Sequence, residues 1–292
     1  MTTPENTLRV GISDPHPSFR GAFANRDFSF LFIGQLGSEI GNGAVQLALP
    51  WLVLKLTDSA FQLGFAYFFQ FSPMLLFGIL GGVFVDRWDR RLTIVIDETK
   101  AGLKVIMRAR LLQVSVLLGF VLNLVVAPIQ VLIPLFVRDI KHAAVGYFGV
   151  MVAGLLVGLL VGSLTAPQTA RRIGLGPMAI GAVSLLGIVI SIAAWPPGLW
   201  PPVVAMFIAG TAVGSLNVAQ ITLIQGSTSD DERGRVSATY YTATLGVRPV
   251  GFLAMGALAS AVDIRFLFVA LGVMALLVGI VLSQIREVRE HR

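Results

Sequence analysis

Long apolar blocks alternate with short polar connections along almost the whole chain. Eight blocks are 19 to 27 residues long and together hold 180 of the 292 residues. A transmembrane α-helix needs about 20 apolar residues, and these blocks are too long and too weakly alternating for barrel strands. The pattern therefore predicts an all-α polytopic membrane protein with about eight transmembrane helices. The blocks are residues 28–54, 61–85, 114–137, 147–165, 177–195, 203–224, 236–259 and 266–285.

The composition narrows the class of protein further. Apolar residues make up 55% of the chain and charged residues 13%, whereas about a quarter of a soluble domain is charged. Within the eight blocks, the charged residues are Glu39 and Arg248. These figures exclude a soluble enzyme and a disordered chain. The sequence has no cysteine, so it offers no disulfide framework and no thiolate metal site.

Basic residues set the expected orientation. With the N-terminus inside the cell, the inner tails and loops hold 17 Lys and Arg residues and the outer loops hold 4. The positive-inside rule then places both termini in the cytoplasm, with the chain in the cell inner (plasma) membrane. The net charge of +6 reflects this orientation in the lipid bilayer and argues against a nucleic-acid partner. The outer loop at 195–202, WPPGLWPP, fits a rigid turn with interfacial tryptophans.

Polar residues follow one face of the first block. Gln35, Glu39, Asn42 and Gln46 are spaced by 4, 3 and 4 residues, which is a helical repeat. Polar groups in hydrocarbon need a partner or water, so the stripe either lines a cavity or supplies hydrogen bonds between helices. We favour the cavity. Whether Glu39 carries the coupling proton or has a structural role stays open.

A second polar face lies in the seventh block. Tyr240, Thr244 and Arg248 follow one another at intervals of four residues, and Pro249 comes directly after them. An arginine near the middle of a span must pair or face water. Arg248 either holds Glu39 or an anionic substrate, or it pairs with a backbone carbonyl that the proline frees. Both interpretations stay open.

The third, fourth and sixth blocks add weaker candidates. Asn123 and Gln130 lie seven residues apart on one face of the third block, and Gln220 is one of the polar positions of the sixth. Each fits a cavity wall, although hydrogen bonds between helices suit them slightly better. The GxxxGxxxG run at 154–162 favours close packing within the chain over a dimer face. An oligomer is left open.

An internal repeat links the second and fourth blocks. GGVFVDRWDRR at 81–91 and GSLTAPQTARR at 162–172 both end an apolar block with glycine and continue to an arginine pair, at an offset of 81 residues. Asp58 and Asp139, in the loops that precede these blocks, have the same offset. Two halves related by a parallel repeat are a known transporter architecture.

The first of these basic loops carries a family resemblance. It resembles the signature loop of the major facilitator superfamily, and it departs from the pattern at Asp89, where the family has glycine. With the flanking sequences GQLGSEIGNGAVQLALPWLVLKLTDSAFQLG and DDERGRVSATYYTATLGVRPVGFLAMGALAS, the chain is similar to the transmembrane secretion effector branch, which resembles the enterobactin exporter and macrolide-efflux proteins. The resemblance implies a role in gating for the matching positions. These are Gly82, Asp86, Arg87, Arg90 and Arg91.

The resemblance also implies that four helices are missing. The family has twelve helices in two halves of six, and the apolar stretch at 92–96 is too short to span a membrane. The family's helices 3 to 6 are therefore expected to be absent, with the junction near residue 97. The expected parts are a cytoplasmic tail (1–27), a remnant of the first half with two helices and the signature loop (28–97), a basic interfacial connector (98–113), the second half with six helices (114–285) and a cytoplasmic tail (286–292).

The function implied by the resemblance is secondary active transport. We expect proton-coupled efflux, of the multidrug-resistance type, of small amphipathic compounds or siderophore-like molecules. The alternative is a non-transporting truncated facilitator, either a deletion remnant or a membrane interaction protein. The sequence has no Walker loop, HExxH motif or Ser-His-Asp grouping, and its three histidines are scattered. We therefore expect no enzymatic activity, no cofactor and no metal, with a proton gradient as the energy source.

Overall fold

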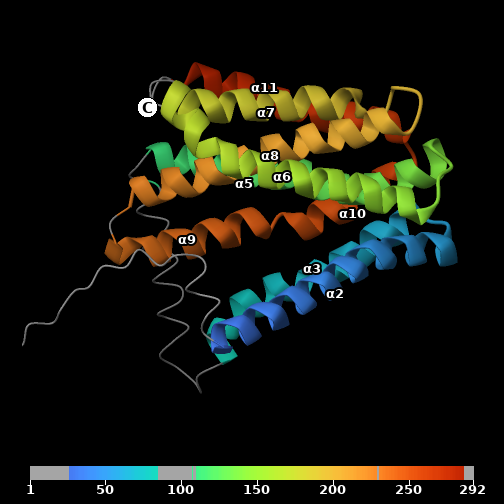
Figure 1. The fold of residues 1–292 in the computed structure, drawn as a ribbon, viewed down its shortest axis with the longest axis horizontal. Helices are drawn as coiled ribbons and strands as arrows, with labels where there is room; N and C mark the ends of the chain where they lie inside the picture. Colours follow the sequence, from blue (N-terminus) through green and yellow to red (C-terminus); the bar gives the residue numbers. More distant parts are fainter. Residues whose placement is uncertain (1–25, 85–106, 108–109, 229, 286–292) are drawn as a thin grey trace, which may run out of the picture. The chain divides into compact units, whose positions relative to one another are not determined.

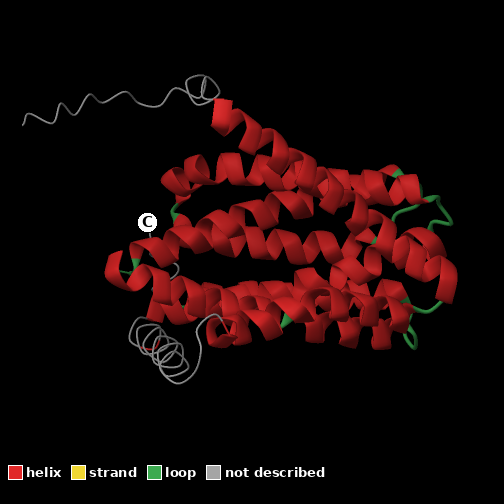
Figure 2. Cartoon of the chain, turned by 90° about the horizontal axis from the view of Figure 1, so that it is seen from below, coloured by secondary structure: helices red, strands yellow, loops and turns green. Residues whose placement is uncertain are grey.

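The computed structural model describes residues 26–84, 107, 110–228 and 230–285, and in these ranges the chain is helical with short connections and no strand (Figures 1 and 2). A chain in lipid must satisfy its backbone N–H and C=O groups internally, and a helix does so within one segment. The chain divides into two compact units, residues 1–48 and 49–292. The predicted junction near residue 97 lies outside the described residues.

The described helices follow the apolar blocks closely. Six stretches are long and apolar enough to cross a membrane, counted over the described residues, and they correspond to the last six predicted blocks. The first two blocks form α2 and α3, which that count does not include, so eight spans and their orientation stay predictions. The helices are α2 (Arg26–Thr57), α3 (Ala60–Phe84), α5 (Arg110–Leu135), the π-helix η1 (Phe136–Ile140), α6 (Val145–Ile173), α7 (Leu175–Ala193), α8 (Trp200–Gly226), α9 (Asp230–Leu245), α10 (Arg248–Ala259) and α11 (Ile264–Gln284).

The seventh block is one membrane-length stretch, as predicted, but its helix is interrupted. It forms two helices, α9 and α10, which are separated by a turn at Gly246 and Val247. The physical cause is Pro249, which has no N–H to donate to the carbonyl of Leu245 and whose ring would clash with it. Pro249 occupies the first turn of α10 instead, where a missing N–H leaves no helical bond unmade.

Helix α5 is the centre of the second unit. It contacts α3, α8, α9, α10 and α11, and 59% of its spanning window is buried, against 22% for that of α6. Burial is uninterrupted from Val131 to the end of α5 and on to Val137 of η1. By contrast, α6 exposes large apolar side chains such as Leu160 and Leu164. An apolar face of this kind is what lipid contact requires.

Glycines bring several helix pairs into backbone contact. A Cβ atom at Gly158 or Gly162 of α6 would overlap a carbonyl oxygen of α8, which confirms that the GxxxGxxxG run packs within the chain. Helices α7 and α11 approach at Gly187 and Gly272 in the same way, and α3 approaches α10 at Gly64. Figure 1 shows α6 beside α8 and α7 beside α11. Small residues allow this closeness because they keep side chains out of the interface.

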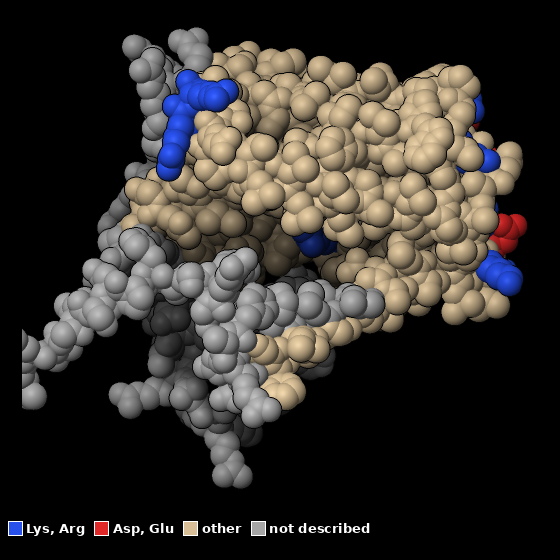
Figure 3. All heavy atoms as spheres, viewed as in Figure 1, with Lys and Arg blue, Asp and Glu red and all other residues tan. Residues whose placement is uncertain are grey.

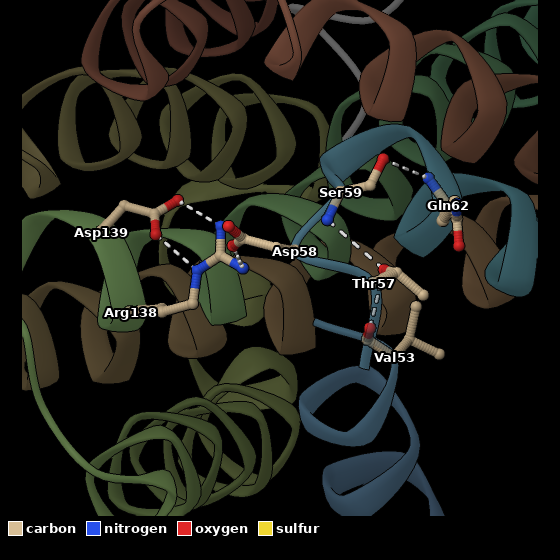
Figure 4. A network of polar contacts seen from close by, with 7 residues as sticks. All are labelled: Val53, Thr57, Asp58, Ser59, Gln62, Arg138 and Asp139. Atoms are coloured by element: carbon tan, nitrogen blue, oxygen red, sulfur yellow. Dashed lines mark hydrogen bonds and ion pairs between the residues drawn. The ribbon is translucent and has the colours of Figure 1, made fainter. Parts of the chain in front are cut away.

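One arginine ties η1 to the turn between α2 and α3 (Figure 4). Arg138 Nη1 lies 2.8 Å from Asp58 Oδ1, and its Nε and Nη2 donate to both carboxylate oxygens of Asp139, the latter at 3.1 Å. Asp58 has a positive φ of 52°, and Thr57 and Ser59 brace the turn with side-chain hydrogen bonds. The two aspartates of the predicted repeat therefore share one cation.

Charged side chains lie mainly toward the ends of the bundle. On the face seen in Figure 3, the long surface between the two ends consists almost entirely of uncharged residues. This distribution fits a bilayer, whose hydrocarbon layer is about 30 Å thick and excludes unpaired charge. The chain is thus an all-α, multi-pass membrane protein.

Candidate functional site

Four helices bring polar side chains together inside the apolar bundle. Asn123 comes from α5, Gln220 from α8, Tyr240 and Thr244 from α9, and Arg248 is the first residue of α10. Tyr240 and Thr244 keep the spacing predicted in the sequence because α9 is helical through Leu245. The break after Leu245 then places Arg248 at the start of a new helix. We call these five residues the polar cluster.

Arg248 reaches across to the neighbouring helix. Its Nε donates to Asn123 Oδ1 at 2.5 Å, while Asn123 Nδ2 donates to the backbone oxygen of Gly119 at 2.8 Å. The second bond fixes the amide so that its oxygen faces the guanidinium. Because Asn123 is neutral, this contact orients the positive charge of Arg248 without cancelling it.

The observed partner, Asn123, is not among the partners expected from the sequence, which are Glu39, an anionic substrate and a backbone carbonyl freed by Pro249. Among the described side chains, Arg138 forms ion pairs with Asp58 and Asp139, and no ion pair joins Arg248 to a carboxylate. The side chain of Glu39 lies outside the described part of the structure, so its pairing with Arg248 stays a prediction. The guanidinium of Arg248 has five N–H donors, and the bond to Asn123 uses one of them.

Tyr240 and Gln220 form the most buried pair of the cluster. The Tyr240 hydroxyl donates to Gln220 Oε1 at 2.6 Å, and both residues are less than 8% exposed. Gln220 Nε2 is buried and finds no hydrogen-bond acceptor among the described residues. An unpaired amide donor of this kind costs about 1–3 kcal/mol. Thr244 satisfies its own hydroxyl by donating to the backbone oxygen of Tyr240 at 2.8 Å.

Gly119 makes room for this arrangement. A Cβ atom at this position would lie 2.5 Å from the Tyr240 hydroxyl oxygen and 2.7 Å from Thr244 Cγ2. The glycine therefore lets α9 press its polar face against α5. Sequence reasoning missed Gly119, and it noted Gln220 without a reason to select it from the other polar residues of its block. Their partners lie on other helices, and spacing along one helix cannot show them.

The other predicted site residues lie apart from the cluster or cannot be placed against it. Gln130 follows Asn123 by seven residues, about 10 Å along α5. The stripe of Gln35, Glu39, Asn42 and Gln46 belongs to the unit of residues 1–48, so its approach to the cluster stays a prediction. Gly82 lies in the last turn of α3. The remaining loop positions, Asp86, Arg87, Arg90 and Arg91, lie outside the described residues.

The cluster has the chemistry of a polar recognition site. A guanidinium, an amide and a phenol sit among apolar helices, where the low dielectric strengthens any bond to an anion or a polar ligand atom. The nearby helix break is also typical of substrate sites, since irregular backbone at membrane depth is tolerated where it is covered by protein or lines a cavity. The described residues contain no group of three or more side chains that could hold a metal ion.

Comparisons with known proteins point to a transporter family. The family model described as Major Facilitator Superfamily matches residues 115–292, which is more than half of the chain. The Enterobactin exporter EntS of Citrobacter koseri is 28% identical over 96 residues, and those of Salmonella choleraesuis and Escherichia coli O1:K1 are 27% identical over 96 residues. Each match covers 33% of this chain and 21% of the relative. The match thus spans about a fifth of the length of these curated relatives. No solved structure matches the chain.

Proposed function

Because the chain belongs to the major facilitator superfamily, a family of membrane transporters and not of enzymes, we propose that it is a secondary active transporter of the cell inner membrane. The proposed activity is proton-coupled efflux of small amphipathic or siderophore-like molecules. The similarity to enterobactin exporters supports the export direction and the siderophore-like class, although it covers a third of this chain.

The polar cluster is the observation that carries this proposal. Arg248 keeps a net positive charge beside the helix break, and it is oriented toward Asn123 of a second helix. Arg248 is half-buried and has no carboxylate partner among the described side chains, and a cation in this setting attracts an anionic or electron-rich group of a substrate. The unpaired Nε2 of Gln220 supplies a further donor on α8, beside Tyr240 of α9. Such a site suits hydroxyl- or carboxylate-bearing molecules with a large apolar part.

Glu39 is the proposed carrier of the coupling proton. It is the one acidic residue within the eight apolar blocks. A carboxylate in a membrane span is expensive when ionised and unpaired, so it can alternate between a protonated and an ionised form as its surroundings change.

Transport in proteoliposomes tests the proposal. The purified chain is reconstituted, a pH gradient is imposed, and movement of enterobactin and of a fluorescent amphipathic amine is followed. We expect Arg248→Gln to lower transport of the anionic substrate about tenfold or more, because a bond to a charged group contributes about 1.5–3 kcal/mol. Arg171→Gln, a change of an exposed arginine at the end of α6, is the matched control and leaves the rate unchanged. Glu39→Gln should remove the response to the pH gradient.

One observation favours a second candidate, a non-transporting truncated facilitator. Between the end of α3 at Phe84 and the start of α5 at Arg110 there are 25 residues, too few for four helices of about 20 residues each. A facilitator cavity needs walls from both halves. Saturable, gradient-driven transport by the reconstituted chain would exclude this candidate, whereas its absence with correctly folded protein would favour it.

A further inference from the structure

A cavity that shares no lining residue with the polar cluster lies at one end of the helical bundle. It has a volume of about 380 Å³ and is lined by the end of η1, the connection between α7 and α8, and the start of α11. Figure 1 shows these connections at the same end of the bundle. The volume is within the range of small-ligand sites. The basic residues of its wall are Lys141 and Arg265.

The wall of this cavity is held in place by Lys141. Its Nζ donates to the backbone oxygens of Pro196 and Gly198, both at 2.8 Å, and Tyr147 donates from its hydroxyl to the oxygen of Leu199 at 2.5 Å. Gly198 has a φ of +87°, a conformation that L side chains rarely adopt. An ammonium group has three N–H donors, so these two bonds leave the third for a ligand.

Arg265 brings a second cation to the same cavity. Its guanidinium lies 6.0 Å from the centre of the Trp195 ring, and that ring packs edge-on against Phe266 at 6.4 Å. Burial and then the charge of Arg265 lower the pKa of Lys141 from its ordinary value. The two cations thus repel each other across the cavity, and an anion between them would relieve that repulsion.

The acidic groups near this end of the bundle are already engaged. Asp139 pairs with Arg138, and Asp263 caps α11 by accepting the backbone N–H of Arg265 at 2.8 Å. No acidic residue is among the described residues that line the cavity. The positive charge of the pocket therefore has no internal counter-ion in this part of the chain.

The surroundings of the cavity are those of a membrane surface. Trp195, Trp200 and Phe266 are 53%, 74% and 61% exposed, and aromatic side chains of this kind gather at the level of lipid headgroups. The adjoining helices then continue into the apolar bundle, where acyl chains would lie. A soluble anion would use the two cations and leave the aromatic surface unused.

We propose that this cavity binds a phosphate-bearing anion, namely the headgroup of an anionic phospholipid. Lys141 and Arg265 hold the phosphate, and the aromatic side chains flank the glycerol and upper acyl chains. The site depends on the chain lying in a bilayer and does not depend on transport. Its consequence is a lipid anchor that links the α7–α8 connection to the first turn of α11.

Native mass spectrometry of the full chain tests this site. Protein in detergent is given equal amounts of phosphatidylglycerol and phosphatidylcholine of the same acyl length. We expect retention of phosphatidylglycerol to exceed that of phosphatidylcholine, and Arg265→Gln to lower it about fivefold, which is the contribution of one basic residue near a lipid surface. Arg171→Gln, at the opposite end of α6, is the control for charge and leaves retention unchanged.

A competition arm separates the two sources of phosphate. Inorganic phosphate and glycerol 3-phosphate are added at millimolar concentration before the lipid. A lipid site keeps its phosphatidylglycerol, because the aromatic and acyl contacts add to the bond. Equal retention of the two lipids, retention that survives Arg265→Gln, or full displacement by inorganic phosphate would each overturn the proposal. Arg265 is exposed, so its replacement should fold, and an unchanged gel-filtration profile verifies this.

Discussion

Two helix contacts of the second unit are built in opposite ways. Helices α6 and α8 meet through glycines on both sides, and the hydroxyl of Ser215 bonds to the backbone of Gly162. Helices α5, α8 and α9–α10 meet through long polar side chains: Arg248 of α10 bonds to Asn123 of α5, and Tyr240 of α9 bonds to Gln220 of α8, whose buried amide nitrogen has no partner among the described residues. The first contact fixes two backbones in one register. The second is held by bonds that a ligand can replace, so this is the contact at which we expect motion and recognition.

The largest expected effect is on the glycine contact. Gly158→Ala would place a methyl group within the carbonyl of Phe207, and backbone on both sides must shift. We expect a loss of about 3 kcal/mol, the upper part of the range for overpacked interfaces. The midpoint of unfolding by SDS measures it. Gly181→Ala in α7 is the matched control, because nothing lies within 4 Å of a Cβ there. Equal midpoints for the two variants would contradict the rigid-contact interpretation.

A smaller loss is expected at the polar contact. Gly119→Ala places its methyl group against the tips of Tyr240 and Thr244, and such tips can move where a carbonyl cannot. We expect about 1–2 kcal/mol. In the Tyr240→Phe background the cost should fall, because the hydroxyl that meets the methyl group at 2.5 Å is gone. A double-mutant cycle measures this coupling. Strict additivity would show that the absence of a side chain at Gly119 is not needed to accommodate the Tyr240 hydroxyl.

The sharpest separation of stability from function comes from removing both partners of the buried pair. Tyr240→Phe alone should lose about 1 kcal/mol, since Gln220 then has no partner at either end of its amide. The double change Tyr240→Phe with Gln220→Leu removes the unpaired groups together, and we expect its stability to return to within about 1 kcal/mol of the original chain. Efflux should stay impaired in both variants. Full transport by the double variant would show that this pair is structural.

The smallest expected effect on stability concerns Lys141, which bonds to the connection between α7 and α8. Burial and Arg265 lower the pKa of Lys141. A base whose folded pKa is lowered binds fewer protons than in the unfolded chain. Stability should therefore rise slightly with pH between the lowered value and the ordinary 10.5. Labelling with an amine reagent should reach its midpoint below pH 10.5, and Arg265→Gln should move that midpoint upward. An unchanged midpoint in Arg265→Gln would show that the charge of Arg265 does not lower the pKa of Lys141.

The sequence predicts the helices of the second unit well because each one carries its own signal. Apolar runs of about 20 residues lead directly to α5 through α8 and α11, and the glycine spacing at 154–162 predicts a close neighbour. Pro249 could have indicated the break in the seventh span. How the helices pack decides that α8 is the neighbour of α6. It also decides that Arg248 bonds to Asn123, which is 125 residues away in the sequence. No periodicity within a single helix contains that information.

The sequence predicts most residues of the candidate site, but it does not predict which of them bond to one another. Asn123, Tyr240, Thr244 and Arg248 were selected as polar residues at helical spacing, and the structure brings them together. Gly119 has no side chain to attract notice, and its importance arises from a tyrosine on another helix. The number of spans, the orientation and the approach of Glu39 stay predictions.

The two faces of α6 should also tolerate different substitutions during evolution. On the face toward α8, a side chain at Gly158 or Gly162 would overlap the α8 backbone, so homologues that replace either residue lose the close contact between α6 and α8. Toward lipid, Leu160 and Leu164 meet acyl chains, which accept any apolar side chain equally well. Natural variation along this helix should therefore rise and fall with a period of about 3.6 residues. Selection acts on size along one face and on polarity alone along the other.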